Sequence, residues 1–184
     1  MSSHDLLIEA IEAGSITQVK KLSSKRRFNL SRRYTEYFRT AVKFGRINIL
    51  KYLMSRNVKH LDKGNYKFVY LAAQNGHAEM VSYLLSLGYK PLSYYAQDLL
   101  ICINCNPINQ IIDEYDLFTD ENALWAAFNN GHMDTVKVLV ELYIDHGYTT
   151  SCVMYMISLD NKKDTSAVLD YIDNYKNPPK FSGR

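Results

Sequence analysis

One short pattern occurs twice in this 184-residue chain and constrains its fold more than any other feature. Residues 71–89, LAAQNGHAEMVSYLLSLGY, match residues 126–142, AAFNNGHMDTVKVLVEL, in having alanines, then Asn-Gly-His, then an aliphatic run. Similarity of this kind is typical of folds that stack one unit several times. The glycines of the two copies, Gly76 and Gly131, therefore serve as landmarks in a search for further copies.

The same frame fits at Gly14 and Gly45, with an alanine four residues before each glycine and aliphatic residues five and eight after it. Two weaker copies have asparagine in place of the glycine. Their apolar positions hold Cys102 and Ile111 around Asn106, and Ile157 and Leu169 around Asn161. Landmarks at positions 14, 45, 76, 106, 131 and 161 predict six units of about 30 residues.

Each unit is expected to be a hairpin of two α-helices. Before the landmark of the second unit, Phe38, Ala41 and Val42 recur at helical spacing, and after it aliphatic residues do so at positions 47, 50, 53 and 54. Glycine and asparagine tolerate the positive φ that a tight turn between two helices requires. Small residues before the landmark allow neighbouring helices to approach closely.

Among helical-hairpin repeats of this period, the chain resembles ankyrin-repeat proteins. Residues 72–89 are similar to the alanine-alanine-x-x-glycine-histidine, paired aliphatics, leucine-leucine and terminal glycine of that family. The resemblance extends through the frame over about residues 5–172. It implies an all-α ankyrin-repeat solenoid of about six stacked hairpins, forming a single domain over residues 1–175 before a flexible tail, 176–184. The repeats lie near residues 5–34, 35–65, 66–95, 96–120, 121–150 and 151–175.

The chain departs from the family at the start of each unit. The family's threonine-proline-leucine-histidine opening is absent, and residues 67–70 read KFVY and residues 122–125 NALW in its place. We expect the loss of this hydrogen-bonded cap to give softer helix starts. Divergent units rich in tyrosine and asparagine resemble those encoded by large DNA viruses of protists and insects.

Composition and motifs favour an intracellular protein that is not an enzyme. Hydrophobic residues make up 47% of the chain, but no apolar run approaches the ~18 residues of a membrane span. The N-terminus lacks the basic start and apolar core of a secretion signal, which predicts a cytoplasmic or nuclear protein. No phosphate loop, nucleophile elbow, HExxH or dinucleotide fingerprint occurs, so no cofactor and no catalytic residue are expected.

Cysteine and histidine patterns predict structural roles. Cys102 and Cys105 have CxxC spacing, but no second pair or matching histidines accompany them, so Cys102 is expected in the core and not at a zinc site. Cys152 leaves an odd total of three cysteines, which is no disulfide framework. His77 and His132 both follow a landmark glycine, and we expect each to start the second helix and to hydrogen-bond locally.

Charge divides the chain into two unlike parts. Residues 1–68 carry 15 Lys and Arg against 5 Asp and Glu, a net of +10, whereas residues 69–184 carry 7 against 14, a net of −7. The basic part includes KKLSSKRRFNLSRR, residues 20–33, across the link between the first two units. The resemblance implies that this link projects as a hairpin finger. It is either a binding site or a solvated basic loop.

These observations predict a monomeric protein-protein interaction module that binds an acidic patch of its partner, a host protein if the chain is viral. Ankyrin arrays bind through their concave face and through the fingers between repeats. On this chain the resemblance implies contacts at Arg26, Arg27, Arg32, Arg33, Lys59, Asp62, Lys63, Asn65, Lys90, Tyr94, Asp120 and Glu121. The alternatives are binding of nucleic acid or another anionic surface by the basic half, and a structural remnant without a partner. Protein ranks first because Tyr34, Tyr37 and Phe38 fall on core positions and are not free to stack on bases.

Overall fold

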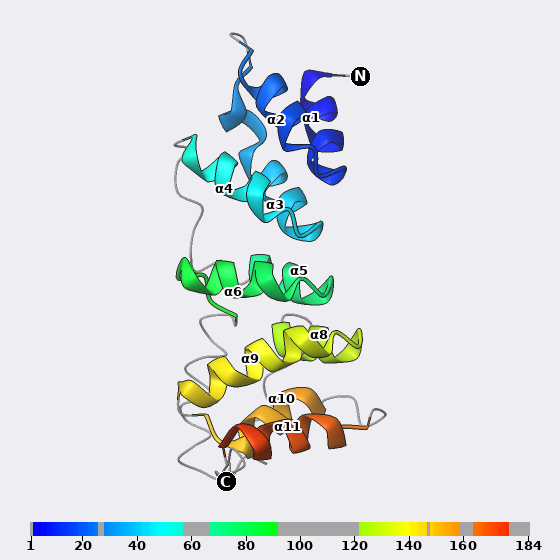
Figure 1. Ribbon diagram of the computed structural model, residues 1–184, viewed down its shortest axis with the longest axis vertical. Coiled ribbons are helices and arrows are strands. Elements are labelled where there is room, and N and C mark those ends of the chain that lie inside the picture. Colours follow the sequence, from blue (N-terminus) through cyan, green and yellow to red (C-terminus); the bar gives the residue numbers. More distant parts are fainter. Residues whose placement is uncertain are drawn as a thin grey trace, which may run out of the picture.

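The computed structural model describes residues 2–25, 28–56, 67–91, 122–146, 148–158 and 164–176. Within these ranges the chain forms α-helices joined by turns and one short 3-10 helix, η1, with no strand. The helices lie in layers that follow one another along the long axis, from the N-terminus at one end to the C-terminal helices at the other (Figure 1). The all-α repeat fold predicted from the sequence is confirmed.

Consecutive helices pair into antiparallel hairpins, as predicted from the apolar frame. Contacts join α1 to α2, α3 to α4, α5 to α6 and α8 to α9. The elements are α1 (Ser3–Glu12), α2 (Ile16–Ser23), η1 (Leu30–Arg33), α3 (Tyr34–Lys43), α4 (Ile47–Ser55), α5 (Lys67–Gln74), α6 (Ala78–Ser86), α8 (Ala123–Asn129), α9 (Met133–Asp145), α10 (Thr150–Ser158) and α11 (Ser166–Lys176).

The turns inside the hairpins use the landmark glycines with positive φ. Gly76 lies between α5 and α6 with φ 73°, a conformation that residues with a Cβ rarely adopt. Its N–H donates to the carbonyl of Ala73 at 3.1 Å, and the N–H of His77 donates to that of Ala72 at 3.0 Å. These bonds satisfy carbonyl groups that the end of α5 would otherwise leave unpaired.

The core lies between the layers, at the positions that the frame predicts. The small residues before the landmark glycines are at most 3% exposed: Ala10, Ala41, Ala72 and Ala127. The ring of Phe38 in α3 lies 4.7 Å from that of Phe68 in α5, so the aromatic contacts cross from one layer to the next. Tyr34, Tyr37 and Phe38 are all buried, as predicted.

The stacking order differs from the prediction at one layer. Helix α5 packs directly against α8, and α6 packs against α9. Figure 1 shows the two hairpins as adjacent layers. The third and fifth predicted units are therefore neighbours, although the sequence frame predicts a fourth unit, residues 96–120, between them. Residues 96–120 and Cys102 lie outside the described residues, and the number of repeats stays a prediction.

In three of the described hairpins, one side chain reaches back to the hairpin before it. In each case the donor is the side chain of the residue that directly follows the landmark glycine. The acceptor belongs to the neighbouring hairpin, and it is the backbone carbonyl of the residue two positions before that hairpin's landmark glycine. Three such bonds occur: Arg46 Nη2 to Glu12 at 2.7 Å, His77 Nε2 to Lys43 at 2.8 Å, and His132 Nε2 to Gln74 at 3.1 Å. The bond from His132 independently places α8–α9 directly after α5–α6.

The prediction for these histidines is half right. His77 and His132 are the N-cap residues of α6 and α9, so each does start a second helix. The expected local hydrogen bond is wrong, because neither side chain caps its own helix and each bonds a carbonyl of the neighbouring hairpin. The imidazole crosses the layer boundary since the preceding glycine turn leaves room for it.

Helix α8 also differs from expectation, because it has a side-chain cap in spite of the missing opening motif. The Asn122 Oδ1 accepts from the N–H groups of Leu124 at 2.9 Å and Trp125 at 3.2 Å. Its Nδ2 donates to the carbonyl of Met156 at 3.4 Å, and the residue is 2% exposed. A soft start was the wrong prediction for α8, since asparagine supplies the cap.

The register of the last predicted unit is displaced. The frame around Asn161 places Leu169 in an apolar position, but its side chain is 39% exposed. Val168 and Ile172 are the buried residues of α11. The frame fails at Leu169 because the amphipathic pattern of α11 decides which of its sides packs inward.

Candidate functional site

The most uneven charge distribution lies in the first two hairpins. Residues 14–56 contain 12 Lys and Arg and a single acidic residue, Glu36. Neither α2 nor α4 contains Asp or Glu. These two second helices contact each other, so their cations share one surface. The positive charge predicted from the sequence therefore lies partly on regular helices, and not only in the link between the units.

Lysines of the second helices lie over tyrosine rings of the next layer. The Nζ of Lys20 in α2 is 5.7 Å from the ring centroid of Tyr52 in α4, and that of Lys51 in α4 is 4.9 Å from Tyr83 in α6. Such contacts hold a cation at the surface with its charge still accessible. In the part of the chain that the structure describes, no carboxylate lies within salt-bridge distance of Lys20 or Lys51.

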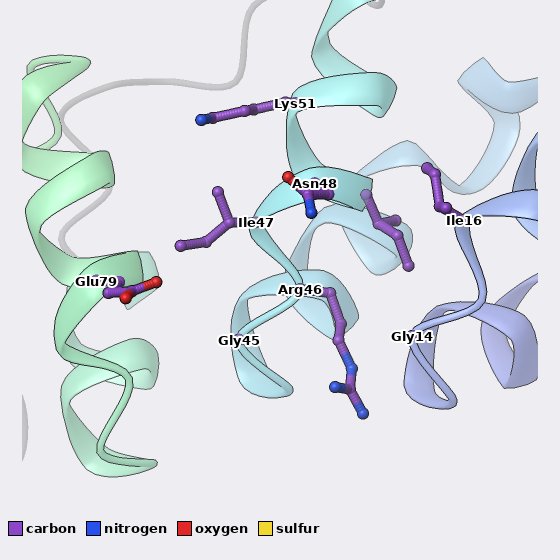
Figure 2. Close-up of a pocket in the computed structure, with 9 residues that line it drawn as sticks. Gly14, Ile16, Gly45, Arg46, Ile47, Asn48, Lys51 and Glu79 are labelled. Atoms are coloured by element: carbon purple, nitrogen blue, oxygen red, sulfur yellow. The ribbon is translucent and has the colours of Figure 1, made fainter.

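A groove of about 480 Å³ lies along the N-terminal ends of α2, α4 and α6. Its lining includes Ile16 of α2, Ile47 and Lys51 of α4, and Glu79 of α6, together with Arg46. Figure 2 shows Ile47 and Lys51 extending from α4 toward α6, and Ile16 on the opposite flank of α4. The groove thus combines three aliphatic side chains, including the nearly buried Ile49, with two cations and one carboxylate.

Arg46 is fixed in position at the edge of this groove. Its Nε and Nη2 donate to the carbonyl of Glu12 at 3.2 and 2.7 Å. The guanidinium also lies over Gly14, where an added Cβ would come within 3.1 Å of it. A carbonyl leaves the positive charge of Arg46 uncompensated, since no carboxylate of the described residues pairs with it.

The described part of the first link does not project as the predicted finger. The ring of Phe28 lies 4.7 Å from that of His4 and 6.5 Å from that of Tyr37. Leu30 begins η1 and is 8% exposed. Apolar side chains therefore hold residues 28–33 against α1 and α3. The sequence analysis considered only the basic residues of this link and missed the anchoring role of its apolar residues. Arg26 and Arg27 lie outside the described residues, and so does the side chain of Arg32.

Arg33 is already engaged within the protein. Its Nη1 lies 3.2 Å from Asp5 Oδ1 and its Nε 2.9 Å from Glu36 Oε2. Hydrogen bonds from the backbone and side chain of Ser2 lower the pKa of Asp5, and Arg33 adds to this effect. Of the four arginines predicted to form a docking cluster, Arg33 thus has two intramolecular partners.

The other predicted contact residues are mostly beyond the ranges that the structure describes. Lys90 is described and is partly buried after the end of α6. Seven residues of the later links lie outside the described residues: Lys59, Asp62, Lys63, Asn65, Tyr94, Asp120 and Glu121. Their role as partner contacts stays a prediction.

The C-terminal hairpins contrast with this basic surface. On α9, Glu141 accepts a hydrogen bond from the Tyr171 hydroxyl and Asp145 accepts one from the Tyr175 hydroxyl at 2.9 Å. Burial, and then the bond to Glu141, raise the pKa of Tyr171 to about 12. The Nζ of Lys137 lies 5.6 Å from the ring centroid of Tyr171, so Lys137 also lies over a tyrosine ring, like Lys20 and Lys51. Unlike these two lysines within the described ranges, Lys137 pairs with a carboxylate, that of Asp134 at 3.8 Å.

His, Cys, Asp and Glu side chains are the usual protein ligands of metal ions. Among the described ranges, no three His, Cys, Asp or Glu side chains gather in a group that could hold a metal ion. His77 and His132 have their Nε2 atoms committed to backbone carbonyls. The geometry instead presents a rigid, charged surface on a stack of hairpins.

Comparison with known families agrees with this architecture. Residues 7–95 match a family model described as ankyrin repeats, in three copies. Residues 7–95 contain ankyrin repeats. The matched range begins within α1 and extends past the end of α6, so it includes the basic residues 14–56 and the groove. Ankyrin repeats are modules for protein-protein interaction and are typically not enzymes.

No curated protein matched this sequence. Among the helices that the structure describes, none is long and apolar enough to cross a membrane.

Proposed function

We propose that this protein is an interaction module that binds an acidic surface of a partner protein through its first two ankyrin repeats. The observation that carries the proposal is the charge of residues 14–56, with 12 basic residues against one acidic residue. Exposed ion pairs contribute little to folding, and unpaired like charges oppose it slightly. A surface that gathers unpaired cations is therefore better explained by attraction of a partner than by stability.

The contact residues of this proposal come from two sources. The resemblance to ankyrin repeats supplies the concave face and the links, with Arg26, Arg27 and Arg32 in the basic link. The second helices add Lys20 and Lys51, whose positions in the structure support a continuous positive surface. Arg33 has a smaller share because Asp5 and Glu36 already pair with it.

A nucleic acid is the alternative partner for a basic surface. Sequence-blind phosphate binding needs only cations, whereas firm binding of single strands also uses exposed aromatic rings. Tyr34, Tyr37 and Phe38, which follow the basic link in the sequence, are buried, and Phe28 within the link packs against His4 and Tyr37. Burial of these rings favours a protein partner. The resemblance to viral repeats extends the proposal to a host protein, bound by a monomer in the cytoplasm or nucleus.

Charge reversal in the link tests this proposal. The variant Arg26→Glu, Arg27→Glu, Arg32→Glu leaves the ion pairs of Arg33 intact. We expect it to keep the melting temperature of the wild type and to lose most of a captured partner, chiefly through slower association. A matched control reverses three cations of the C-terminal half, Lys137, Lys162 and Lys176, and should retain the partner.

The same proteins separate the two classes of partner. If random duplex DNA binds the wild type at low salt and its affinity falls steeply as the salt concentration rises, the result supports phosphate binding. Indifference to DNA together with loss of the protein partner supports the interaction module. If the link variant keeps every interaction of the wild type, the basic link is a solvated loop and the proposal is wrong.

A further inference from the structure

We propose that the groove along α2, α4 and α6 is a docking site for an acidic polypeptide segment that carries an aliphatic side chain. The inference rests on the proposed function for the class of partner, and it adds a site on the second helices that is separate from the links. Three features of the lining support it: the aliphatic pair, the unpaired cations, and the position of the single carboxylate.

The aliphatic pair offers an apolar contact to the partner. Ile16 and Ile47 each lie two residues after a landmark glycine, at the start of α2 and α4, and both are partly buried. Ile49 closes the groove beneath them at 2% exposure. Aliphatic side chains of a partner segment that lies along the groove would remove the remaining apolar surface of Ile16 and of Ile47 from water.

The cations beside this apolar contact set the charge of the occupant. Arg46 is held by the carbonyl of Glu12, and Lys51 is held over the ring of Tyr83. Both side chains are thus oriented before a partner arrives, which lowers the entropy lost on binding. No carboxylate among the described residues pairs with either, so carboxylates of a partner would find two oriented cations in the groove lining.

Glu79 distinguishes an acidic polypeptide from a nucleic acid. It lies on α6, across the groove from Ile16, and it would repel a phosphate at that side (Figure 2). A polypeptide can place its carboxylates near Arg46 and Lys51 and a neutral or basic residue near Glu79, whereas a nucleic acid carries a phosphate at every step. Among the described residues that line the groove, none is aromatic, so none offers a ring on which a base could stack.

The equivalent position in the later layers lacks this chemistry. Lys137 of α9 corresponds to Lys51 of α4, since each lies six residues after its landmark glycine and over a tyrosine of the next layer. Asp134 pairs with Lys137 at 3.8 Å, however, and α6 has Ser82 at the same position. Lys137 therefore provides a matched control for Lys51.

A peptide titration of the full chain tests the groove. The probe is a capped, fluorescein-labelled peptide of two leucines flanked on each side by three glutamates, and fluorescence anisotropy reports its binding. We expect Lys51→Glu to weaken binding by about tenfold and Lys137→Glu by less than about twofold, because only the first charge lines the groove. Ile47→Ser should also weaken binding, and replacement of both leucines by serine should have a similar effect. Circular dichroism verifies that each variant is folded.

Several outcomes would overturn the groove. Equal binding by the wild type and Lys51→Glu excludes it as the site, and so does equal binding of the leucine and serine peptides. If a single-stranded oligonucleotide of the same charge displaces the peptide as well as unlabelled peptide does, the surface binds anions in general and the groove is not a polypeptide site.

Capture experiments separate this inference from the proposed function. If the link variant loses the captured partner while Lys51→Glu and Ile47→Ser keep it, the groove is wrong and the proposed function stands. If peptide binding depends on Lys51 while the link variant keeps its partner, the groove stands and the link assignment falls.

Discussion

The imidazole of His132 lies directly on Gly76 of the preceding layer. A Cβ added to Gly76 would be 2.6 Å from Nδ1 of that ring and 2.8 Å from its Cγ, while Nε2 donates to the carbonyl of Gln74 at 3.1 Å. Gly76 therefore has two roles, since it forms a turn with positive φ and it makes room for a side chain of the next hairpin. At Gly131 only the first role remains, because no described atom lies within 4 Å of an added Cβ.

The two glycines give a matched pair of substitutions. Gly131→Ala should cost about 1–2 kcal/mol of unfolding free energy, the penalty for a Cβ in the left-handed region. Gly76→Ala should cost clearly more, because its Cβ also overlaps the His132 ring. Urea denaturation of both variants measures the difference, and equal losses would contradict the contact between the layers.

The overlap can also be removed from the other side. Gly76→Ala combined with His132→Ala should cost less than the sum of the two single changes, because the ring that the new Cβ meets is gone. Simple additivity of the two free energies would show that His132 does not lie on Gly76.

Much of the fold is readable from the sequence because a few positions repeat their physical roles. Ala72 and Ala127 are buried where helices meet, and Gly76 and Gly131 form the turns, as the frame predicts. The stacking order was missed because the frame assumes that units stack in chain order. A signal was present, since His77 and His132 follow their glycines, whereas Pro107 follows Asn106 and has no side-chain donor.

The candidate site was harder to predict. The charge of the first two units is visible in the composition, but the partners of Arg33 depend on how η1 packs against α1. The groove depends on the side chains of three helices and has no signature in the chain. One signal was overlooked: Lys20 and Tyr52, like Lys51 and Tyr83, are 32 residues apart and in contact.

The cap of α8 predicts a specific loss of stability. Asn122→Ala should lower the free energy of unfolding by about 1 kcal/mol, because the N–H groups of Leu124 and Trp125 lose their acceptor. Asn122→Ser should retain most of the wild-type free energy of unfolding, since serine is also a good N-cap residue. Thermal unfolding compares the three proteins, and an alanine variant as stable as the wild type would refute the cap.

The buried frame predicts a larger effect at Ala72, which is 0% exposed. Ala72→Asp should cost about 3 kcal/mol or more, because it buries a charge with no partner. Gln74→Asp introduces the same charge at an exposed position of the same helix and should cost only about 0.3–1 kcal/mol, the usual penalty for a negative charge at a helix C-terminus. Unchanged melting of Ala72→Asp would show that the helix frame is misplaced.

Tyrosines predict how stability depends on pH. Burial raises the pKa of Tyr34 and Tyr37 from 10.0 to about 12, and burial with the bond to Glu141 does the same for Tyr171. Because the folded state holds these protons more tightly, their contribution is complete below pH 10 and is lost as pH rises to about 12. Urea denaturation across this range should show the fall, and Tyr171→Phe should make it shallower. A constant free energy of unfolding between pH 10 and about 12 would contradict these assignments.

The central claim is that a protein partner binds the first two ankyrin repeats, and hydrogen-deuterium exchange with a captured partner tests it most directly. Backbone amides that a partner covers exchange more slowly than in the free protein. We predict that the partner slows exchange in α2 and α4, residues 16–23 and 47–55, and leaves α9 and α11 unchanged. Protection confined to α9 and α11, with α2 and α4 exchanging as in the free protein, would contradict the claim.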